Sequence, residues 1–343
     1  MLMYGVYHLF CLNYNNRNNS FKKTDSILMN DVTKDLLTLF DYTTDEIVKI
    51  VKLAKDLKDR RGKENEPTVF SGKSGVLIFE KPSLRTRITF ETAINELGGH
   101  SVNLASEMVG MGKRESVEDV ARNLDRIVHL IIARTFKHET IEQLAKYSSI
   151  PVINALSDLY HPCQALAFAL SVYERLSFDE KLNVVFVGDG NNVCNSLMAV
   201  SSKLGYNFTI ACPRGYEPDN SVQKRAQEVA RQTGGSVTIT NDLFPAVSRA
   251  DVIYTDVWTS MGQEAESEKR RSDFKDYQIN MDIISKAPGD VLVTHCLPAH
   301  RGEEITSEVL DSGHSMAFDE AENRLHAQKA VIVHLFSKEN QHE

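Results

Sequence analysis

Two arginines and two hydroxyl residues follow a short apolar run in the first third of the chain. The run Gly75–Phe79 leads into Glu-Lys-Pro-Ser-Leu-Arg-Thr-Arg at 80–87, where a helical pattern begins. A strand that turns into a helix leaves free backbone N–H groups and a positive dipole end at the turn. Guanidinium groups bind phosphate oxygens two at a time. Ser83, Arg85 and Thr86 are therefore a candidate phosphate site, and a solvent-exposed helix start is the alternative.

A histidine and a glutamine three residues apart form the second candidate. Tyr-His-Pro-Cys-Gln at 160–164 follows another apolar run, and Pro162 suits the first position of a helix. At this spacing His161 and Gln164 face the same helix end, where they could hydrogen-bond a carbonyl oxygen and an amide. An imidazole titrates near neutrality and is therefore a ready polarising group. A capping or core histidine is the alternative.

A glycine-rich turn, Gly-Asp-Gly-Asn-Asn at 188–192, ends a third apolar run. It superficially resembles a dinucleotide-binding fingerprint, but the third glycine of that pattern would fall at Val193. The broken spacing argues against a dehydrogenase. Asn191 and Asn192 instead offer amides to a zwitterionic ligand, unless they only form the turn.

Two further motifs follow late apolar runs: Asp-Val-Trp-Thr-Ser-Met-Gly at 256–262 and His-Cys-Leu-Pro at 295–298. In open α/β sheets, ligands bind beyond the carboxyl ends of the strands, so the location favours a site. Asp256 could hold an ammonium group. Cys296 is a candidate for chemistry beside it, although a lone cysteine is more often a small apolar core residue.

The elements that must position these residues alternate along the chain after residue 30, which is typical of βα units and parallel sheets. We expect strands at Gly75–Phe79, Leu130–Ala133, Pro151–Asn154, Asn183–Val187, Phe208–Cys212, Val237–Thr240, Val252–Thr255 and Val291–His295, and helices at Thr44–Lys58, Ser116–Val128, Asn192–Leu204, Ser221–Thr233 and Ala321–Phe336. The predicted fold is α/β, with two similar-sized domains, each a mainly parallel sheet flanked by helices. The main boundary falls near residue 160, where interdomain helices join the domains.

Composition supports this class. The chain has 343 residues, of which 42% are hydrophobic and 25% charged, so two folded domains are expected. Its net charge is −8 and no basic stripe is present, which argues against nucleic acid and anionic lipid as partners. No run approaches the roughly 18 apolar residues that span a bilayer. Five cysteines without paired spacing indicate free thiols and a cytoplasmic protein.

Residues 1–30 are predicted to be a disordered extension. Met1–Leu12 is apolar but has no basic region or small-residue cleavage site, and an Asn-rich stretch follows, which disfavours a signal peptide. Met29 is an alternative start. A mitochondrial transit peptide stays open, because no acidic residue precedes Asp25.

Taken together, the five motifs resemble those of the ornithine carbamoyltransferase family, in order and at its spacing, over residues 33–340. The resemblance implies transfer of the carbamoyl group of carbamoyl phosphate to the δ-amine of L-ornithine, giving L-citrulline and phosphate, a reaction of arginine metabolism. It implies a carbamoyl-phosphate domain at 31–160 plus 321–343 and an ornithine domain at 161–320. It also implies a homotrimer or a multiple of trimers, with no cofactor and no metal.

Carried over position by position, the resemblance implies two sets of binding residues. The carbamoyl-phosphate set is Ser83, Leu84, Arg85, Thr86, Arg134, His161, Gln164 and Arg324, and the ornithine set is Asn192, Asp256, Ser260, Met261, Cys296 and Leu297. Arg134, His161, Cys296 and Arg324 would be catalytic. The resemblance also implies a cis peptide bond before Pro298.

The sequence departs from the family pattern at three places. Leu84 stands where the family usually has Thr, and Phe168 stands where it usually has Asp. Near Gly110 the family commonly has a His or Gln that reaches the neighbouring subunit, a role that Lys113 or Arg114 could take. The alternatives are a carbamoyltransferase for putrescine or N-acylated ornithine, or a catalytically silent paralogue that serves as a binding subunit.

Overall fold

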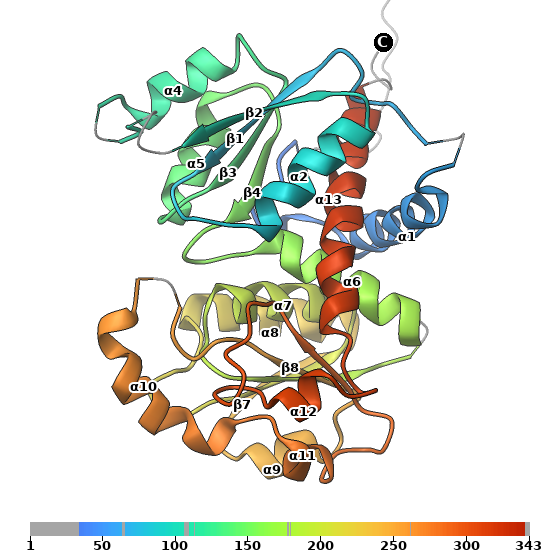
Figure 1. Cartoon of the computed structure of the whole chain (residues 1–343), viewed down its shortest axis with the longest axis vertical. Coiled ribbons are helices and arrows are strands. Elements are labelled where there is room, and N and C mark those ends of the chain that lie inside the picture. Colours follow the sequence, from blue (N-terminus) through green and yellow to red (C-terminus); the bar gives the residue numbers. More distant parts are fainter. Residues whose placement is uncertain are drawn as a thin grey trace, which may run out of the picture. The chain divides into compact units, whose positions relative to one another are not determined.

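The computed structural model describes residues 34–63, 66–105, 110–112, 114–176, 178, 180–260 and 262–339. The predicted extension 1–30 lies outside these residues. The described chain contains two parallel sheets with helices around them, so the predicted α/β class is confirmed (Figure 1). All eight predicted strands are present, with ends that differ by at most two residues. Among the described residues, no helix is both long and apolar enough to cross a membrane.

The first sheet has four parallel strands in the order β2-β1-β3-β4. Its strands are β1 (Ser74–Phe79), β2 (His100–Ala105), β3 (Leu130–Arg134) and β4 (Val152–Leu156), and its helices include α1 (Thr44–Arg60), α2 (Arg85–Glu96), α4 (Val117–Leu124) and α5 (His138–Tyr147). Strand order reverses at β1, which pairs with β2 on one side and β3 on the other. The segments after β1 and β3 therefore share the position where α/β sheets bind ligands.

The sequence analysis missed β2 and extended one helix too far. Among the described strands β2 pairs with β1 alone, at an edge of the sheet, and its sequence His-Ser-Val-Asn-Leu-Ala has no continuous apolar run. The helix predicted at Ser116–Val128 ends at Leu124. There the backbone N–H groups of Ile127 and Val128 turn back to Leu124 O, and the chain enters β3.

The second sheet has five parallel strands in the order β7-β6-β5-β8-β9. Its strands are β5 (Asn183–Val187), β6 (Asn207–Ala211), β7 (Ser236–Thr240), β8 (Val252–Thr255) and β9 (Leu292–His295), and its helices include α7 (Asn192–Lys203), α8 (Asn220–Thr233), α9 (Leu243–Val247), α10 (Ser267–Phe274), α11 (Met281–Ile284) and α12 (Ser307–Leu310). Strand order reverses between β5 and β8. The turn at 188–192 and the motif at 256–262 follow these two strands, so the fold brings them to one edge.

Two long helices run between the elements of the two sheets. α6 (Pro162–Leu176) follows β4, and α13 (Ala317–Glu339) packs along α6, α1 and α2 (Figure 1, red). α13 begins four residues before the predicted start at Ala321. Its Lys329 is fully buried and pairs with Glu66 and Glu96 at 2.7 and 2.9 Å. The C-terminal helix is thus anchored against elements of the first sheet.

Candidate active site

A cavity of about 790 Å³ is lined by segments that follow strands of both sheets. Thirteen of the fourteen predicted binding residues line it: Ser83, Leu84, Arg85, Thr86, Arg134, His161, Gln164, Asn192, Asp256, Ser260, Cys296, Leu297 and Arg324. Met261 lies outside the described residues. Motifs that are more than 200 residues apart in the sequence therefore meet at one site, because each follows the carboxyl end of a strand or opens a helix there.

The start of α2 forms one end of this cavity. The hydroxyl of Ser83 caps the helix, since it accepts a hydrogen bond from Thr86 N at 3.3 Å. Leu84 makes no capping hydrogen bond and is 70% exposed, so the family's usual hydroxyl is absent here. Arg85 begins the helix, and burial lowers the pKa of its guanidinium. The backbone N–H groups and the positive helix end remain available to an anion.

Two buried guanidinium groups add positive charge to this end of the cavity. Arg134 ends β3, whereas Arg324 reaches the cavity from α13. Arg324 Nη2 donates to Thr86 Oγ1 at 3.2 Å, and Arg324 Nη1 donates to Gln164 Oε1 at 2.5 Å. Burial, and then the charges of Arg324 and Arg85, lower the pKa of Arg134 to about 10. Three like charges around one cavity favour a bound anion.

His161 lies beside these arginines at the start of α6. Its backbone N–H donates to Ser196 Oγ at 2.7 Å, which fixes the turn. Burial, followed by the charges of Arg324 and Arg134, lowers the pKa of His161 well below its usual value. The imidazole is therefore neutral at pH 7. It can polarise a ligand carbonyl without adding a fourth positive charge.

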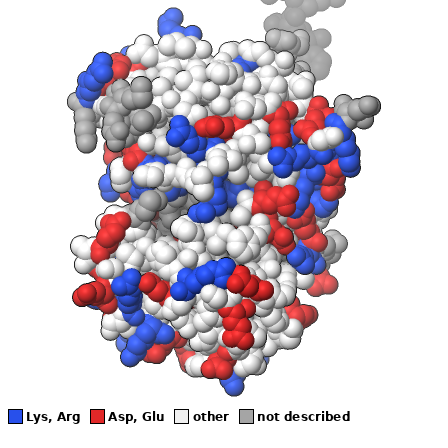
Figure 2. All heavy atoms as spheres, in the orientation of Figure 1, with Lys and Arg blue, Asp and Glu red and all other residues white. Residues whose placement is uncertain are grey.

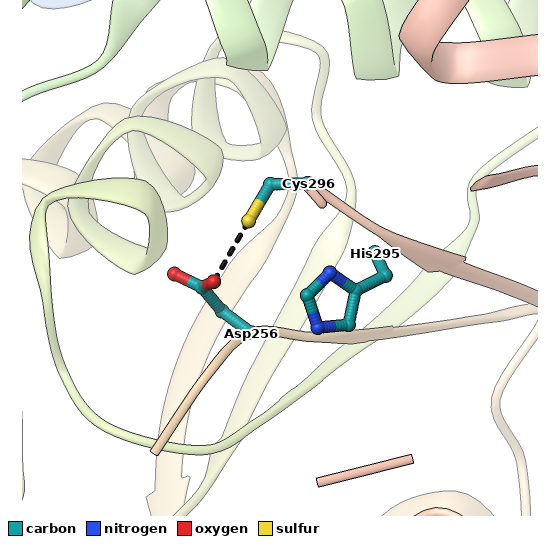
Figure 3. Close-up of side chains that lie close together, drawn as sticks. All are labelled: Asp256, His295 and Cys296. Carbon is teal, nitrogen blue, oxygen red and sulfur yellow. Dashed lines mark hydrogen bonds between the residues drawn. The ribbon is translucent and has the colours of Figure 1, made fainter. Parts of the chain in front are cut away.

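The opposite side of the cavity carries a carboxylate and a thiol. Cys296 Sγ donates to Asp256 Oδ1 at 2.7 Å (Figure 3). Asp256 also accepts from Asn191 Nδ2 and from Val257 N, each at 2.7 Å. Burial, and then the charge and hydrogen bond of Asp256, raise the pKa of Cys296 well above its usual value. The thiol is thus protonated at neutral pH and acts as a donor.

The turn after β9 is supported by a buried pair that the sequence analysis missed. His295 Nδ1 accepts from Leu297 N at 2.8 Å, so its Nε2 carries the proton that faces Glu304 Oε1 at 3.1 Å. Leu297 has a positive φ of 53°, and the bond from it to Pro298 is cis, as predicted. The pair lies nine residues apart, and neither its spacing nor its residue types distinguish it from a surface ion pair.

Asp256, His295 and Cys296 place one ligand atom each within 4.8 Å of one another, a spacing that a metal ion would accept. Each of these atoms already has a hydrogen-bonding role toward another residue. The thiol faces Asp256 (Figure 3), and the imidazole lies between Leu297 N and Glu304. The arrangement is thus accounted for by hydrogen bonds, and the expected lack of a metal stays a prediction.

Several expected residues have roles that the sequence analysis did not assign. Asn192 Nδ2 donates to the backbone oxygen of Ser157 at 2.5 Å, which ties the start of α7 to the segment after β4. Phe168 is fully buried on α6, and its ring packs edge-on against Tyr254 at 5.6 Å. An aromatic contact with β8 thus occupies the position where the family usually has Asp.

The loop around Gly110 carries Lys113 and Arg114, the two residues that could take the neighbour-reaching role. Gly110 has a φ of +61° and accepts a hydrogen bond from Arg114 N at 2.7 Å. Arg114 is exposed, and Lys113 lies outside the described residues. The role of this loop between subunits stays a prediction.

Comparison with known proteins identifies the class of this fold and site. The carbamoyl-P binding domain of aspartate/ornithine carbamoyltransferase matches residues 34–174, and the Asp/Orn binding domain of the same enzymes matches residues 180–335. The chain therefore belongs to the aspartate/ornithine carbamoyltransferase family.

Its relatives share both sequence and structure over nearly their whole length. An ornithine carbamoyltransferase of Pyrococcus horikoshii is 50% identical over 302 residues, which cover 88% of this chain and 95% of the relative. The solved structure of the Pyrococcus furiosus enzyme is 49% identical with a TM-score of 0.84, covering 87% of this chain and 96% of that one. The anabolic enzyme of Campylobacter jejuni is 37% identical with a TM-score of 0.85, covering 90% and 100%.

Proposed function

We propose that this protein is an enzyme that transfers the carbamoyl group of carbamoyl phosphate to the δ-amine of L-ornithine, giving L-citrulline and phosphate. One observation carries the proposal. A single cavity has a wall of three arginines from α2, β3 and α13, and an opposing wall with Asp256 and Cys296, which follow strands of the second sheet. An anionic acyl phosphate and a cationic amino acid fit such a cavity side by side. The activity named for the relatives matches this pairing.

On the first wall, Ser83, Arg85 and Thr86 hold the phosphate together with the N–H groups at the start of α2. Leu84 contributes its backbone only, because its side chain has no hydroxyl. Arg134, His161, Gln164 and Arg324 contact the carbamoyl group. The family resemblance assigns these contacts, and their common position in the cavity supports them.

On the second wall, Asp256 pairs with the α-ammonium group of ornithine, while Asn192, Ser260 and Met261 hold the α-amino and carboxylate groups. Cys296 and Leu297 line the end of the pocket where the δ-amine reacts. A diamine lacks the carboxylate, and an N-acylated amine cannot pair with Asp256. This wall therefore favours ornithine over putrescine and N-acetylornithine.

The chemistry requires no cofactor. A neutral δ-amine attacks the carbamoyl carbon, and negative charge develops on the carbonyl oxygen. Arg134, Arg324 and His161 stabilise this charge, and each such donor typically contributes about 3 to 4 kcal/mol. The C–O bond to phosphate then breaks as the arginines stabilise the leaving group. The departing phosphate takes the amine proton, because the Cys296 thiol is already protonated.

The functional organisation follows from the same assignment. Residues 31–160 and 321–343 form the carbamoyl-phosphate domain, and residues 161–320 form the ornithine domain. Cytoplasmic location is supported by the free thiols of all four cysteines in the described residues. Positive and negative side chains mix over the face drawn in Figure 2, which gives nucleic acid no continuous basic surface there.

We also propose that the protein is a homotrimer or a multiple of trimers. Two exposed apolar side chains at the start of α2, Leu84 at 70% just before the helix and Ile88 at 53% in its first turn, support a contact between subunits. Sedimentation of the intact protein tests the assembly. An active, stable monomer would contradict it.

Steady-state kinetics with carbamoyl phosphate and each of four amines test the activity: ornithine, putrescine, aspartate and N-acetylornithine. We expect a kcat/KM for ornithine at least 100-fold above the kcat/KM for each of the other three amines. Citrulline formed from ornithine is detected colorimetrically. A preference for putrescine or N-acetylornithine would reassign the substrate. No turnover with any amine would support a silent paralogue.

A further inference from the structure

A carboxyl group of α13 lies directly behind the cavity wall. Glu320 is fully buried and accepts three hydrogen bonds. Its Oε1 accepts from Gln164 Nε2 at 2.5 Å and from the hydroxyl of Tyr254 at 2.7 Å, and its Oε2 accepts from Thr294 Oγ1 at 2.7 Å. These partners belong to α6, β8 and β9. The carboxylate is thus held from three elements and in turn holds Gln164.

The amide of Gln164 lies between this carboxylate and a guanidinium group. Arg324 Nη1 donates to Gln164 Oε1 at 2.5 Å on the side opposite Glu320. A guanidinium group has only donors, and a carboxylate has only acceptors. Gln164 must therefore turn its NH2 group toward Glu320 and its oxygen toward Arg324. Gln164 and Arg324 both line the cavity, whereas Glu320 does not, so we infer that the amide oxygen, on the Arg324 side, is the atom available to a ligand.

We propose that Glu320 is a positioning residue that makes the site selective for a carbamoyl group over an acetyl group. It acts by holding Gln164 so that Oε1, which has a second lone pair, accepts a hydrogen bond from the NH2 of the carbamoyl group. An acetyl phosphate of similar shape has a methyl group there, so the second lone pair of this oxygen has no donor and only the bond from Arg324 remains. A site built around a hydrogen bond rejects the analogue that lacks it. This inference rests on the proposed carbamoyl-phosphate activity.

The charge state of Glu320 determines the assay conditions. Burial raises the pKa of Glu320 to about 7, although hydrogen bonds from Thr294, Tyr254 and Gln164 and the charge of Arg324 all act to lower it. At pH 8 the carboxylate form predominates, and it can only accept hydrogen bonds. Ligand selectivity is therefore measured at pH 8.

The test compares two stable phosphonates that differ at one group. Phosphonoacetamide carries the NH2 group, and acetonylphosphonate carries a methyl group in its place. Calorimetry should show that the wild type prefers the amide about tenfold, the effect of one additional buried hydrogen bond. In Glu320→Gln, a neutral amide replaces the charged acceptor at 320, so only Arg324 still holds the amide of Gln164 in its orientation. We expect the preference to fall below threefold while acetonylphosphonate binds within threefold of the wild-type affinity.

Two control variants separate positioning from simple structural support. Tyr254→Phe and Thr294→Val each remove another hydrogen bond to Glu320 but leave its bond to Gln164. Both should keep the amide preference. If either loses it as fully as Glu320→Gln does, the carboxylate only supports the fold and the proposal is overturned. Retention of a tenfold preference by Glu320→Gln would overturn it as well.

A second variant exchanges the side chains of positions 164 and 320. It keeps the same atoms and the same net charge, so it provides a test if Glu320→Gln alone does not fold. In the double variant Gln164→Glu with Glu320→Gln, position 164 presents only acceptors, while the amide at 320 donates to it and accepts from Tyr254 or Thr294. Recovery of the amide preference supports the proposal, and an exchange variant that binds both phosphonates equally contradicts it.

If wild type binds neither phosphonate, the proposed function fails together with this inference. If wild type prefers the amide and the variants do not respond, only the role of Glu320 is wrong.

Discussion

Asp256→Asn tests the ornithine wall most directly, because the surroundings of this carboxylate are specified by the structure. Oδ1 accepts from Cys296 Sγ and Val257 N, and Oδ2 accepts from Asn191 Nδ2. Asparagine has one acceptor oxygen and one NH2 donor, so its NH2 must face a donor on one side. Asn191 cannot reverse freely to relieve this, since its own oxygen caps α7 through two backbone N–H groups.

The magnitude follows from these contacts. Loss of a hydrogen bond to a charged group costs about 1.5 to 3 kcal/mol, which corresponds to a fall of about 10- to 150-fold in kcat/KM for ornithine. The mismatched donor should also lower the free energy of unfolding by about 1 to 3 kcal/mol. Asp256 follows β8 on the second wall. The KM for carbamoyl phosphate should therefore stay within twofold of the wild-type value.

The matched control is Asp251→Asn at the other end of the same strand. Asp251 Oδ2 accepts from the backbone and side-chain nitrogens of Asn183 at 2.6 and 3.1 Å, so this change also removes a charged acceptor. It should destabilise the protein without changing either KM. Steady-state kinetics and urea unfolding of both variants give the comparison. A kcat/KM for ornithine within twofold of wild type in Asp256→Asn, or an equal fall in Asp251→Asn, would refute the reasoning.

The same substitution gives an independent chemical readout. Asp256 raises the pKa of Cys296 through its charge and through the hydrogen bond that it accepts. Its removal lowers the pKa of the thiol, although burial still keeps the pKa high. Alkylation by iodoacetamide at pH 8 should therefore be about tenfold faster or more in Asp256→Asn than in wild type, from the loss of one charge-assisted hydrogen bond. An unchanged alkylation rate would show that the thiol is not held by this carboxylate.

Three further changes test the first wall. Arg85→Ala should lower kcat/KM for carbamoyl phosphate at least 100-fold, a loss of several kcal/mol of transition-state stabilisation, while the unfolding midpoint changes little. Activity within threefold of wild type would show that this arginine does not belong to the phosphate site. Leu84→Thr should add a hydroxyl at the start of α2 and tighten the binding of phosphonoacetamide, measured by calorimetry, about 2- to 10-fold. Weaker binding would contradict this reasoning. Because the pKa of His161 is lowered in the folded state, the unfolded state binds its proton first as pH falls below 6.5. The free energy of unfolding should thus decrease with falling pH below 6.5, by up to about 1.4 kcal/mol per pH unit from this group, and His161→Asn should lose that part of the slope in urea titrations.

The sequence predicted those parts of the fold whose signal is local. Buried parallel strands read as continuous apolar runs, and β3 and β5 were found for this reason, since each contains four consecutive apolar residues. β2 was missed because an edge strand with one neighbour needs no such run. The early end of α4 was missed because the turn after Leu124 depends on where β3 begins, and that is a tertiary constraint.

The candidate site was largely predictable for a related reason. Each motif pairs a chemically capable residue with the end of a strand, and the rule that ligands bind beyond strand ends needs only local information. Glu320 and Glu304 were missed because their roles depend on partners that the sequence does not reveal. Gln164 lies 156 residues from Glu320, and only the packing of α13 along α6 brings them together.

One turn of α13 links the two walls of the cavity. Glu320 and Arg324 are four residues apart and face the same side of the helix. Glu320 bonds to Tyr254 and Thr294 of the second sheet, whereas Arg324 bonds to Thr86 of α2, beside the first sheet. Gln164 joins the two side chains. Glu320, Gln164 and Arg324 thus form one continuous hydrogen-bonded connection from β8 and β9 to the start of α2, and it crosses between the two walls of the cavity.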